Sequence, residues 1–509
     1  MDDQKDNRQG GQPNNAEERT NLQRAISQKQ LTMIGFGGAI GAGLWFSSGE
    51  ALAMGDPGAA LLVYALMGIL VYFMMTSLGE MATKIPLSGS FATYATRFVD
   101  PALGFTMGWS YYFSCAVRIT FTIIIGARII QFWLPPEILP PFIPSLIIFI
   151  LVFLFALKFN STKGFGASES WFVGIRLVAI ILFLVFALLM LLGIIGQSPG
   201  LSNWEYAIKE GGLNSPIPGN ATWIIMLLPI AAFSYQGVEV IGLSAGEASD
   251  PDKSIPKSIN TVVWRILLFY IGGILMISLL VPFDDPHLFG AEVDWYEYEM
   301  RVAYSPFTLV FYNAGFIFFA SVMNTIALIA VIACGNSGFF CATRMLIAMS
   351  NEGKASKAMG KINKRGIPMN ALLFTSVIVF AGFFVDRMPY IEIFDYLLGM
   401  GMMMWLFVWL CIALCHWRFR KAYKAQGYKI EDLKYRAKLY PYGAVFGAIL
   451  CVIAIIGSGL DSLIDFDLVW AIQLYLPILI IILLFVIYKL VKKTKVVPLD
   501  KCDFSAEYK

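Results

Sequence analysis

The run Gly35-Phe36-Gly37-Gly38-Ala39-Ile40-Gly41-Ala42-Gly43 places five glycines within nine residues of an apolar segment. Each glycine costs a helix about 1 kcal/mol relative to alanine, and it leaves backbone amides open to close approach. A dinucleotide-binding loop is excluded because no strand precedes the run. Two alternatives stay open: a helix-packing face built on small residues, and a discontinuous helix whose exposed amides bind an anionic group.

A second interruption lies in the other half of the chain. The stretch Phe233-Ser234-Tyr235-Gln236-Gly237-Val238-Glu239-Val240-Ile241-Gly242 puts polar residues and glycine inside another apolar segment. Paired interrupted helices are typical of inverted-repeat transporters that bind their substrate near the membrane midplane. Helix amino ends attract a carboxylate, and freed carbonyls attract an ammonium group. The two interruptions together predict a site for a zwitterion such as an amino acid.

The composition around these stretches predicts a polytopic membrane protein. Of 509 residues, 58% are hydrophobic and only 14% are charged, whereas a soluble domain carries about a quarter charged residues. These values exclude a disordered chain and an ordinary soluble enzyme. The net charge of +3 is too small to indicate a nucleic-acid partner, so the expected partner is the lipid bilayer.

Apolar runs recur along most of the chain, and a helix needs about 20 apolar residues to cross a bilayer. They predict twelve spans, at 31–52, 58–79, 103–133, 141–158, 171–195, 221–245, 262–282, 306–340, 370–386, 391–415, 440–460 and 468–489. Residues 1–30 are polar and are expected to form a flexible tail, and residues 491–509 form a second tail.

The distribution of lysine and arginine predicts the orientation. There are 38 such residues. Three of them lie in the loops on one predicted side of the membrane (Lys209, Arg301, Arg387), and three lie deep inside spans (Arg118, Arg128, Arg176). The other 32 lie in the tails, in the loops on the same predicted side, or in the few span residues that border those loops. Because basic residues favour the cytoplasmic side, both termini are expected to be cytoplasmic.

Metal and enzyme chemistry are not indicated. The seven cysteines form no CxxC pair, and the two histidines are far apart, so neither a metal nor another cofactor is predicted. No nucleophile–base constellation is present, which argues against an intramembrane enzyme. A membrane sensor of amino acids stays open as an alternative, although the cytoplasmic segments are too short for a signalling domain.

Several longer motifs occur in a fixed order: Leu31–Gly43, Thr76–Ala82, Pro86–Tyr94, Gly246–Ile259, Gly335–Gly338 and His416–Arg420. On these motifs the chain resembles the amino acid–polyamine–organocation (APC) superfamily, and within it the bacterial amino acid permeases related to the lysine-specific permease. The resemblance covers about residues 31–490. The oligomeric state is left open.

The resemblance implies an all-helical fold of two five-helix inverted repeats, about 31–196 and 220–416. Two extra helices follow at about 440–490, and helices 1 and 6 are discontinuous. It also implies proton-coupled uptake of an amino acid across the bacterial inner membrane by alternating access. An amino acid exchanger is the alternative.

The resemblance also implies the substrate site. The substrate carboxylate is expected at the first interruption, with Gly38, Ala39, Ile40, Gly41, Ala42 and Gly43. The α-amino group is expected at the second, with Phe233, Ser234, Tyr235 and Gly237. Phe233 is expected to close over the substrate as a gate. Ala39 and Ala42 stand where many relatives have hydroxyl residues, so backbone amides would have to bind the carboxylate. Thr122 stands where relatives commonly carry an acidic residue.

Glu239 is the lone carboxylate deep in the span 221–245. Charges inside spans mark function or a buried partner. Glu239 is therefore expected to act as counter-ion for a cationic side chain or as proton carrier, and the lysine-permease resemblance favours lysine or another cationic amino acid. Two alternatives stay open: a neutral or other amino acid as substrate, and an internal pair between Glu239 and Arg118.

Arg176 stands where relatives often have a lysine. An arginine cannot lose its proton during a transport cycle. A fixed charge there disfavours sodium coupling, and proton coupling would then use a carboxylate such as Glu239 or Glu80. The alternative is that Arg176 snorkels to the interface. Arg118 and Arg128 lie near one face of their helix, and would disfavour lysine if both faced the pathway.

Overall fold

The computed structural model describes residues 24–39, 41–135, 138–139, 142–210, 221–288, 304–385 and 392–506. In these ranges the chain is helical, and the only extended pairings are two isolated bridges, Ile26 with Ala248 and Leu288 with Tyr304. The prediction of an all-helical protein is confirmed for this part of the chain. Most of the predicted tail 1–30 lies outside the described residues, as do Ile40 and Arg301.

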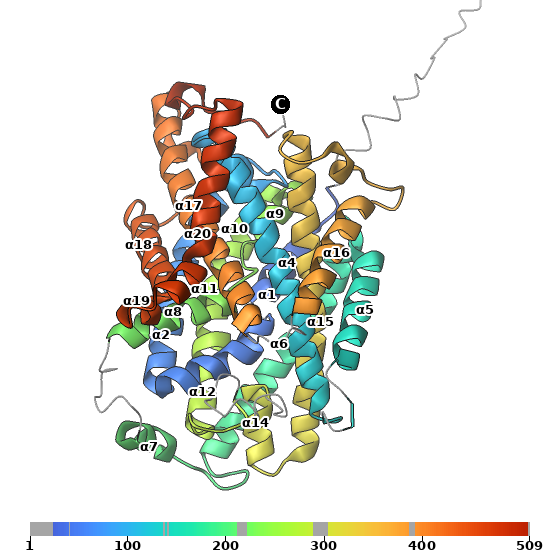
Figure 1. Cartoon of the computed structure of the whole chain (residues 1–509), viewed down its shortest axis with the longest axis vertical. Helices are drawn as coiled ribbons and strands as arrows, with labels where there is room; N and C mark the ends of the chain where they lie inside the picture. The colour runs from blue at the N-terminus through green and yellow to red at the C-terminus, as the bar shows by residue number, and fades with distance from the viewer. Residues whose placement is uncertain are drawn as a thin grey trace, which may run out of the picture.

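The first half of the chain forms helices that alternate with short connections (Figure 1). They are α1 (Gln28–Ala39), α2 (Ala42–Lys84), α3 (Ser90–Phe98), α4 (Pro101–Gln131), α5 (Phe142–Phe159), α6 (Thr162–Leu191) and α7 (Ser202–Glu210). Side-chain caps begin two of them: Asp100 accepts from the Ala102 amide at 2.9 Å, and Ser161 from the Gly164 amide at 3.2 Å. The Ser161 cap explains why α6 begins before the predicted residue 171.

The middle of the chain is broken into shorter pieces. They are α8 (Ala221–Ser234), α9 (Val240–Leu243), a 3₁₀ turn (Ser244–Glu247), α10 (Pro251–Asn260), α11 (Val262–Arg265), a π-helical turn (Ile266–Ile271), α12 (Gly272–Leu280), α14 (Pro306–Asn313) and α15 (Ile317–Asn351). Residues 246–261 lie between two predicted spans. Within them Pro251–Asn260 form α10, which begins with Pro251 in the first turn after Asp250.

The last part contains α16 (Met369–Val385), α17 (Glu392–Ala425), α18 (Tyr442–Gly457), α19 (Leu460–Ile464) and α20 (Leu468–Lys492). Three short 3₁₀ turns lie at Lys357–Gly360, Ile430–Asp432 and Leu499–Lys501. The predicted spans 370–386 and 468–489 match α16 and α20 closely. The predicted span 306–340 is divided at residues 314–316, where Gly315 has φ +81°, and α15 then continues to Asn351.

Eight helices in the described ranges are long and apolar enough to cross a membrane, and three apolar helices of 10–17 residues accompany them. One of the eight, in α2, holds the whole predicted span 58–79 and the last part of the predicted span 31–52. In α2, Asp56 has φ +67° and precedes Pro57, so the helix bends sharply there. The Asp56 carboxylate accepts from the Gly58 and Ala59 amides at 2.7 and 3.0 Å and restarts the helix.

Helices α4 and α15 form the centre of the molecule, with α17 also against α4 and α2 against α8 (Figure 1). In the most apolar window of α4, 78% of residues are buried, against 11% in α20. Because α20 keeps most of its apolar surface outside the protein, it is a peripheral helix suited to contact with lipid.

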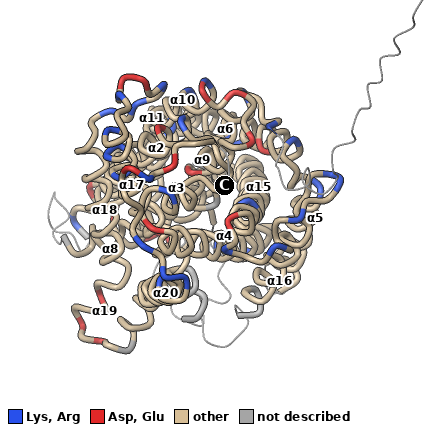
Figure 2. Tube along the Cα trace, turned by 90° about the horizontal axis from the view of Figure 1, so that it is seen from above, with Lys and Arg blue, Asp and Glu red and all other residues tan. Residues whose placement is uncertain are grey.

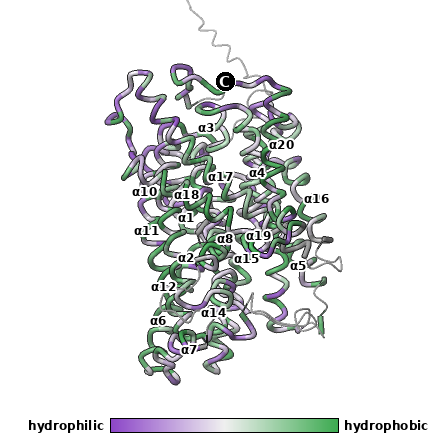
Figure 3. Tube along the Cα trace, turned by 60° about the vertical axis from the view of Figure 1, so that its left-hand side comes forward, coloured by the Kyte–Doolittle hydropathy of each residue, from purple (hydrophilic) through white to green (hydrophobic). Residues whose placement is uncertain are grey.

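One end of the molecule gathers charged and hydrophilic segments around the C-terminus (Figures 2 and 3). Arg97 donates to the Ser505 carbonyl at 2.5 Å, Arg418 to the Val497 carbonyl, and Lys489 to Asp100 at 2.6 Å. These bonds hold the end of α3, the start of α4 and the last part of α17 to α20 and the C-terminal segment at one end.

Candidate functional site

The two glycine-containing stretches coincide with helix ends. Helix α1 ends at Ala39 and α2 begins at Ala42, with Gly41 extended at φ −94° and ψ −175°. Ile40 lies outside the described residues. Helix α8 ends at Ser234, residues 235–239 form turns, and α9 begins at Val240.

These two stretches lie directly against each other. A Cβ atom added to Gly43 would fall 2.6 Å from the Ser234 Cα and 2.9 Å from the Phe233 carbonyl oxygen. Only a residue without a side chain allows two backbones to approach this closely. The start of α2 therefore packs its backbone on the end of α8. Gly41 faces another element, since its Cβ would lie 3.7 Å from the Cys334 sulfur of α15.

The turn after α8 requires Gly237, whose φ is +100°. The backbone carbonyls of this turn are partly occupied. Phe233 accepts from the Gln236 amide at 3.1 Å, and Ser234 accepts from the Tyr270 hydroxyl at 2.9 Å. Each carbonyl oxygen has two lone pairs, so each retains capacity for a second donor.

A buried tyrosine cluster fixes the end of α8. The Tyr64 hydroxyl and the Ser234 hydroxyl lie 2.5 Å apart, and the Tyr235 hydroxyl donates to the Tyr64 carbonyl at 2.9 Å. The rings of Tyr235 and Tyr270 stack with centroids 3.9 Å apart. The side chains of Ser234 and Tyr235 therefore serve this cluster, and their backbone is what remains to face a ligand.

Phe233 is buried and meets the ring of Phe121 edge-to-face, with centroids 4.9 Å apart. Phe121 in turn lines an apolar cavity of about 380 Å³ together with Gly401 and Met404 of α17. The predicted gate thus rests on α4, at a residue that also lines this cavity.

Glu239 is fully buried at the start of α9. Its Oε1 accepts from the Tyr111 hydroxyl at 3.0 Å, and its Oε2 accepts from the Gly237 amide at 3.3 Å. It forms no salt bridge with Arg118, although their charges interact. Arg118 instead lies over the Trp405 ring, 5.3 Å from its centroid.

Arg176 is only 1% exposed, so it does not reach the surface as the snorkelling alternative required. Its Nη2 lies 2.6 Å from Glu169 Oε1, and its Nη1 donates to the Gly37 carbonyl at 3.2 Å. This pair joins α6 to the glycine run of α1. Glu169 was missed from the sequence, although its spacing of seven residues from Arg176 places both on one helix face.

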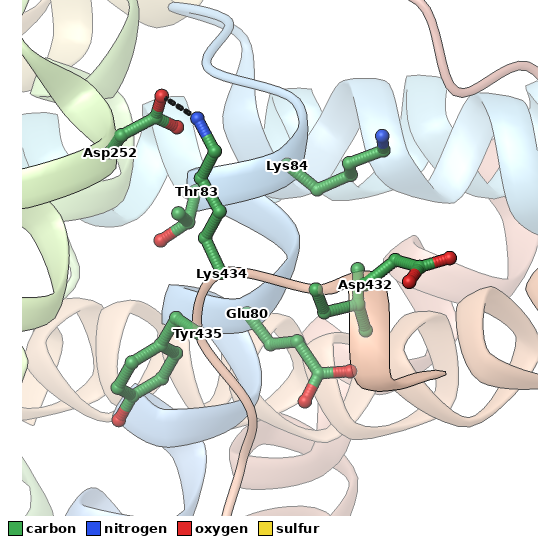
Figure 4. Close-up of a pocket in the computed structure, with 8 residues that line it drawn as sticks. Glu80, Thr83, Lys84, Asp252, Asp432, Lys434 and Tyr435 are labelled. Atoms are coloured by element: carbon green, nitrogen blue, oxygen red, sulfur yellow. Dashed lines mark hydrogen bonds and ion pairs between the residues drawn. The ribbon is translucent and has the colours of Figure 1, made fainter. Parts of the chain in front are cut away.

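Glu80 lies at the end of α2, in a pocket of about 180 Å³ that Figure 4 shows. Its carboxylate accepts two bonds from Arg420 at 2.5 and 2.6 Å and one from the Ala437 amide at 2.6 Å. His416 lies 3.3 Å away. On the other wall of the pocket, Lys434 pairs with Asp252. Glu80 therefore ties α17 and its following loop to α2, apart from the interrupted helices.

A further buried ion pair was not predicted. Glu247, just after α9, pairs with Arg344 of α15 at 2.8 Å and also accepts from Thr162 of α6. Arg344 in turn donates to the Asn160 side chain at 2.8 Å. The Ile26 amide donates to the Glu247 carbonyl at 2.9 Å, so the segment before α1 closes over this network. Arg344 was expected in a cytoplasmic loop, because the predicted span ended at residue 340.

Several buried polar atoms have no hydrogen-bond partner among the described residues: Arg118 Nε and Nη2, Gln236 Oε1, Asn336 Oδ1 and Nδ2, and the indole nitrogen of Trp405. Leaving such a group unpaired costs about 1–3 kcal/mol. In the described ranges, no group of three or more His, Cys, Asp or Glu side chains is placed to hold a metal ion.

Comparison with known proteins identifies the family of this chain. The amino acid permease family matches residues 30–501. The chain belongs to this family. The lysine-specific permease LysP of Lactococcus lactis is 39% identical over 497 residues, covering 96% of this chain and 94% of the relative. LysP of Escherichia coli is 38% identical over 487 residues, 95% and 96% of the two chains.

The histidine permease HisP of Lactococcus lactis is 39% identical over 493 residues, covering 96% of this chain and all of the relative. The permease is thus similar over nearly its whole length to transporters with differing named substrates. It is an amino acid transporter and a multi-pass membrane protein, and its family is one of permeases rather than enzymes.

Proposed function

We propose that this permease takes up a cationic amino acid, lysine in the first place, across the bacterial inner membrane by proton-coupled alternating access. Two of the relatives named above are lysine-specific permeases. The observation that carries the proposal is the backbone contact of Gly43 with Phe233 and Ser234, with the buried Glu239 at the far end of the same turn. This arrangement offers separate partners for a carboxylate, an α-amino group and a cationic side chain.

The proposed topology has twelve spans, with helices 1 and 6 discontinuous, two five-helix inverted repeats, and both termini cytoplasmic. The helix ends at Ala39 and Ser234 support the two discontinuities. The bend at Asp56 supports counting α2 as parts of two spans. The contacts of Arg97, Arg418 and the C-terminal segment support one basic, cytoplasmic end.

In the proposed complex the substrate carboxylate meets the amides of Gly38, Ala39, Ile40, Gly41, Ala42 and Gly43. The positive amino end of α2 favours an anion there. The α-amino group meets the second lone pairs of the Phe233, Ser234 and Tyr235 carbonyls, where the left-handed Gly237 holds the turn open. Phe233 then closes over the bound substrate.

Glu239 is the proposed counter-ion of the substrate side chain and the proton acceptor in coupling. Its two hydrogen bonds leave acceptor capacity, since an ionised carboxylate has about four lone-pair sites. Arg176 is the proposed fixed charge that stands in place of a sodium ion. Its buried bonds to Glu169 and the Gly37 carbonyl support this assignment.

Glu80 is the second carboxylate proposed for proton coupling. Its protonation would be coupled to the separation of α2 and α17 at the end of the molecule where it lies. Its bonds to Arg420 and Ala437 support this role, because they must break if α17 and α2 separate. A transient break would leave a buried charge unpaired, so protonation of Glu80 would ease the opening.

Uptake into proteoliposomes with labelled lysine, arginine, histidine, leucine and glutamate tests the function. We expect lysine uptake that an inward proton gradient drives and a sodium gradient does not. Uptake confined to neutral amino acids would favour the alternative of a neutral permease. Uptake that needs internal amino acid and no gradient would favour an exchanger. Binding of an amino acid without any uptake would favour a sensor.

A further inference from the structure

Arg118 is a buried guanidinium without a protein partner for two of its nitrogens. Its side chain is 4% exposed, and neither Nε nor Nη2 forms a hydrogen bond in the described part of the chain. Its one cation–π contact is the face of Trp405. A charge in a membrane-spanning helix is costly unless it is paired, so its retention in an unpaired state indicates a transient partner.

Glu239 is a buried carboxylate whose charge interacts with that of Arg118. The two belong to different elements, α4 and the start of α9, and Tyr111 connects them. Tyr111 donates to Glu239 at 3.0 Å, and its ring lies 4.9 Å from the ring of Trp405, on which Arg118 rests. Arg118 thus lies beside Glu239 without contacting it.

The polar and titratable groups that interact with Glu239 come from three helices: Tyr111, Cys115 and Arg118 of α4, Cys341 of α15 and Trp409 of α17. Among them Arg118 alone is permanently charged, because a guanidinium keeps its proton in proteins. Whatever binds Glu239 must therefore compete with a fixed positive charge next to it.

We propose that Arg118 is an internal competitor of the substrate for Glu239. Arg118 alternates between two positions: in one it rests on Trp405, as in the structure, and in the other it swings onto the carboxylate and forms the ion pair. A cationic substrate side chain binds Glu239 only while Arg118 rests on Trp405. Its return to Glu239 then expels the substrate on the release side. In this way Arg118 lowers the affinity for cationic amino acids and raises the rate at which they are released.

This inference rests on the proposed function, because it requires a cationic substrate at Glu239. Arg118→Gln removes the competitor and keeps a polar side chain of moderate size. We expect the KM for lysine uptake to fall about tenfold, because the substrate ammonium no longer meets a like charge nearby. The maximal rate should also fall, because release of the substrate becomes slower. Arg118→Lys retains the charge and should restore both values toward wild type.

A merely structural role for Arg118 would give a different result. It would lower the maximal rate without lowering the KM, and it would lower the thermal midpoint of the purified protein. An unchanged or higher KM for lysine in Arg118→Gln overturns the proposal. If wild-type protein moves no cationic amino acid, the proposed function fails and this inference fails with it. If wild type moves lysine and only the KM prediction fails, this inference alone is wrong.

A double-mutant cycle gives the second test should Arg118→Gln fold poorly. Lysine affinity is measured in wild type, Arg118→Met, Glu239→Gln and the double variant. We expect removal of Arg118 to raise affinity in the Glu239 background and to change it less than twofold after Glu239→Gln. Equal effects of the arginine substitution in both backgrounds would show that the two residues do not act on one another.

Discussion

At the scale of single residues, Arg265 is the clearest energetic outlier. It is fully buried between α10 and the π-helical turn, and its three guanidinium nitrogens have no hydrogen-bond partner among the described residues. Its contact is the Phe36 ring, 5.5 Å from the guanidinium carbon. Unlike Arg118, it interacts with no aspartate or glutamate in the described part of the chain.

We therefore expect Arg265→Met to raise the thermal midpoint of the detergent-purified protein, corresponding to a gain on the order of 1 kcal/mol or more. The physical reason is that methionine fills a similar apolar volume without a charge to desolvate. Arg344→Met is the matched contrast and should lower the midpoint, because it leaves Glu247 buried without its partner. A lower midpoint for Arg265→Met would show that this guanidinium has a stabilising partner.

At the scale of elements, the contact of α2 with α8 depends on one missing side chain. We expect Gly43→Ala to abolish uptake, because its Cβ would lie 2.6 Å from the Ser234 Cα and neither backbone can yield without moving a helix. Gly447→Ala in α18 is the control, since nothing lies within 4 Å of its Cβ. It should preserve uptake and stabilise its helix by up to about 1 kcal/mol. Normal uptake by Gly43→Ala would mean that the two stretches separate without cost.

The helix ends show what sequence can and cannot supply at this scale. The ends at Ala39 and Ser234 fall in the two stretches singled out in advance, because glycine and polar residues disturb a helix locally. The start of α10 was missed, since its charges resembled a loop. The pair of Glu247 with Arg344 spans 97 residues, and no local pattern connects them.

The residues of the candidate site also divide into those that the sequence indicates and those that depend on tertiary packing. Glu239 stood out because it is a carboxylate within an apolar run. Its hydrogen bond to Tyr111 depends on how α4 packs on α9, which the sequence of either helix leaves undetermined. The partner of Arg176 could have been found, because Glu169 lies two turns earlier on the same helix.

At the scale of the whole molecule, Asp100 fastens the peripheral α20 to the central α4. Its carboxylate accepts from Lys489 at 2.6 Å and from Thr494 at 2.7 Å. Burial raises the pKa of Asp100, but the bonds from Lys489, the Ala102 amide and Thr494 outweigh it, so the pKa lies below the ordinary value. A lowered pKa contributes stability above the unfolded value, and this is lost as the pH falls through the folded value.

We therefore expect the thermal midpoint to fall as the pH drops below about 4, near the ordinary aspartate value. Asp100→Asn should lower the thermal midpoint at pH 7 and reduce its further fall at acid pH. The exposed Asp465→Asn should do neither. The measurement is thermal unfolding in detergent across a pH series. If the midpoint of Asp100→Asn fell with pH as steeply as that of wild type, carboxylates other than Asp100 would be the cause.

The central claim is that Glu239 binds the cationic side chain of the substrate beside the interrupted helices. The most direct measurement is proton-driven lysine uptake into proteoliposomes by wild type, Glu239→Gln and the exposed Glu205→Gln as control. We predict that Glu239→Gln raises the KM for lysine at least about tenfold and removes the pH dependence of uptake, while Glu205→Gln matches wild type. Unchanged lysine uptake and pH dependence in Glu239→Gln would contradict the account.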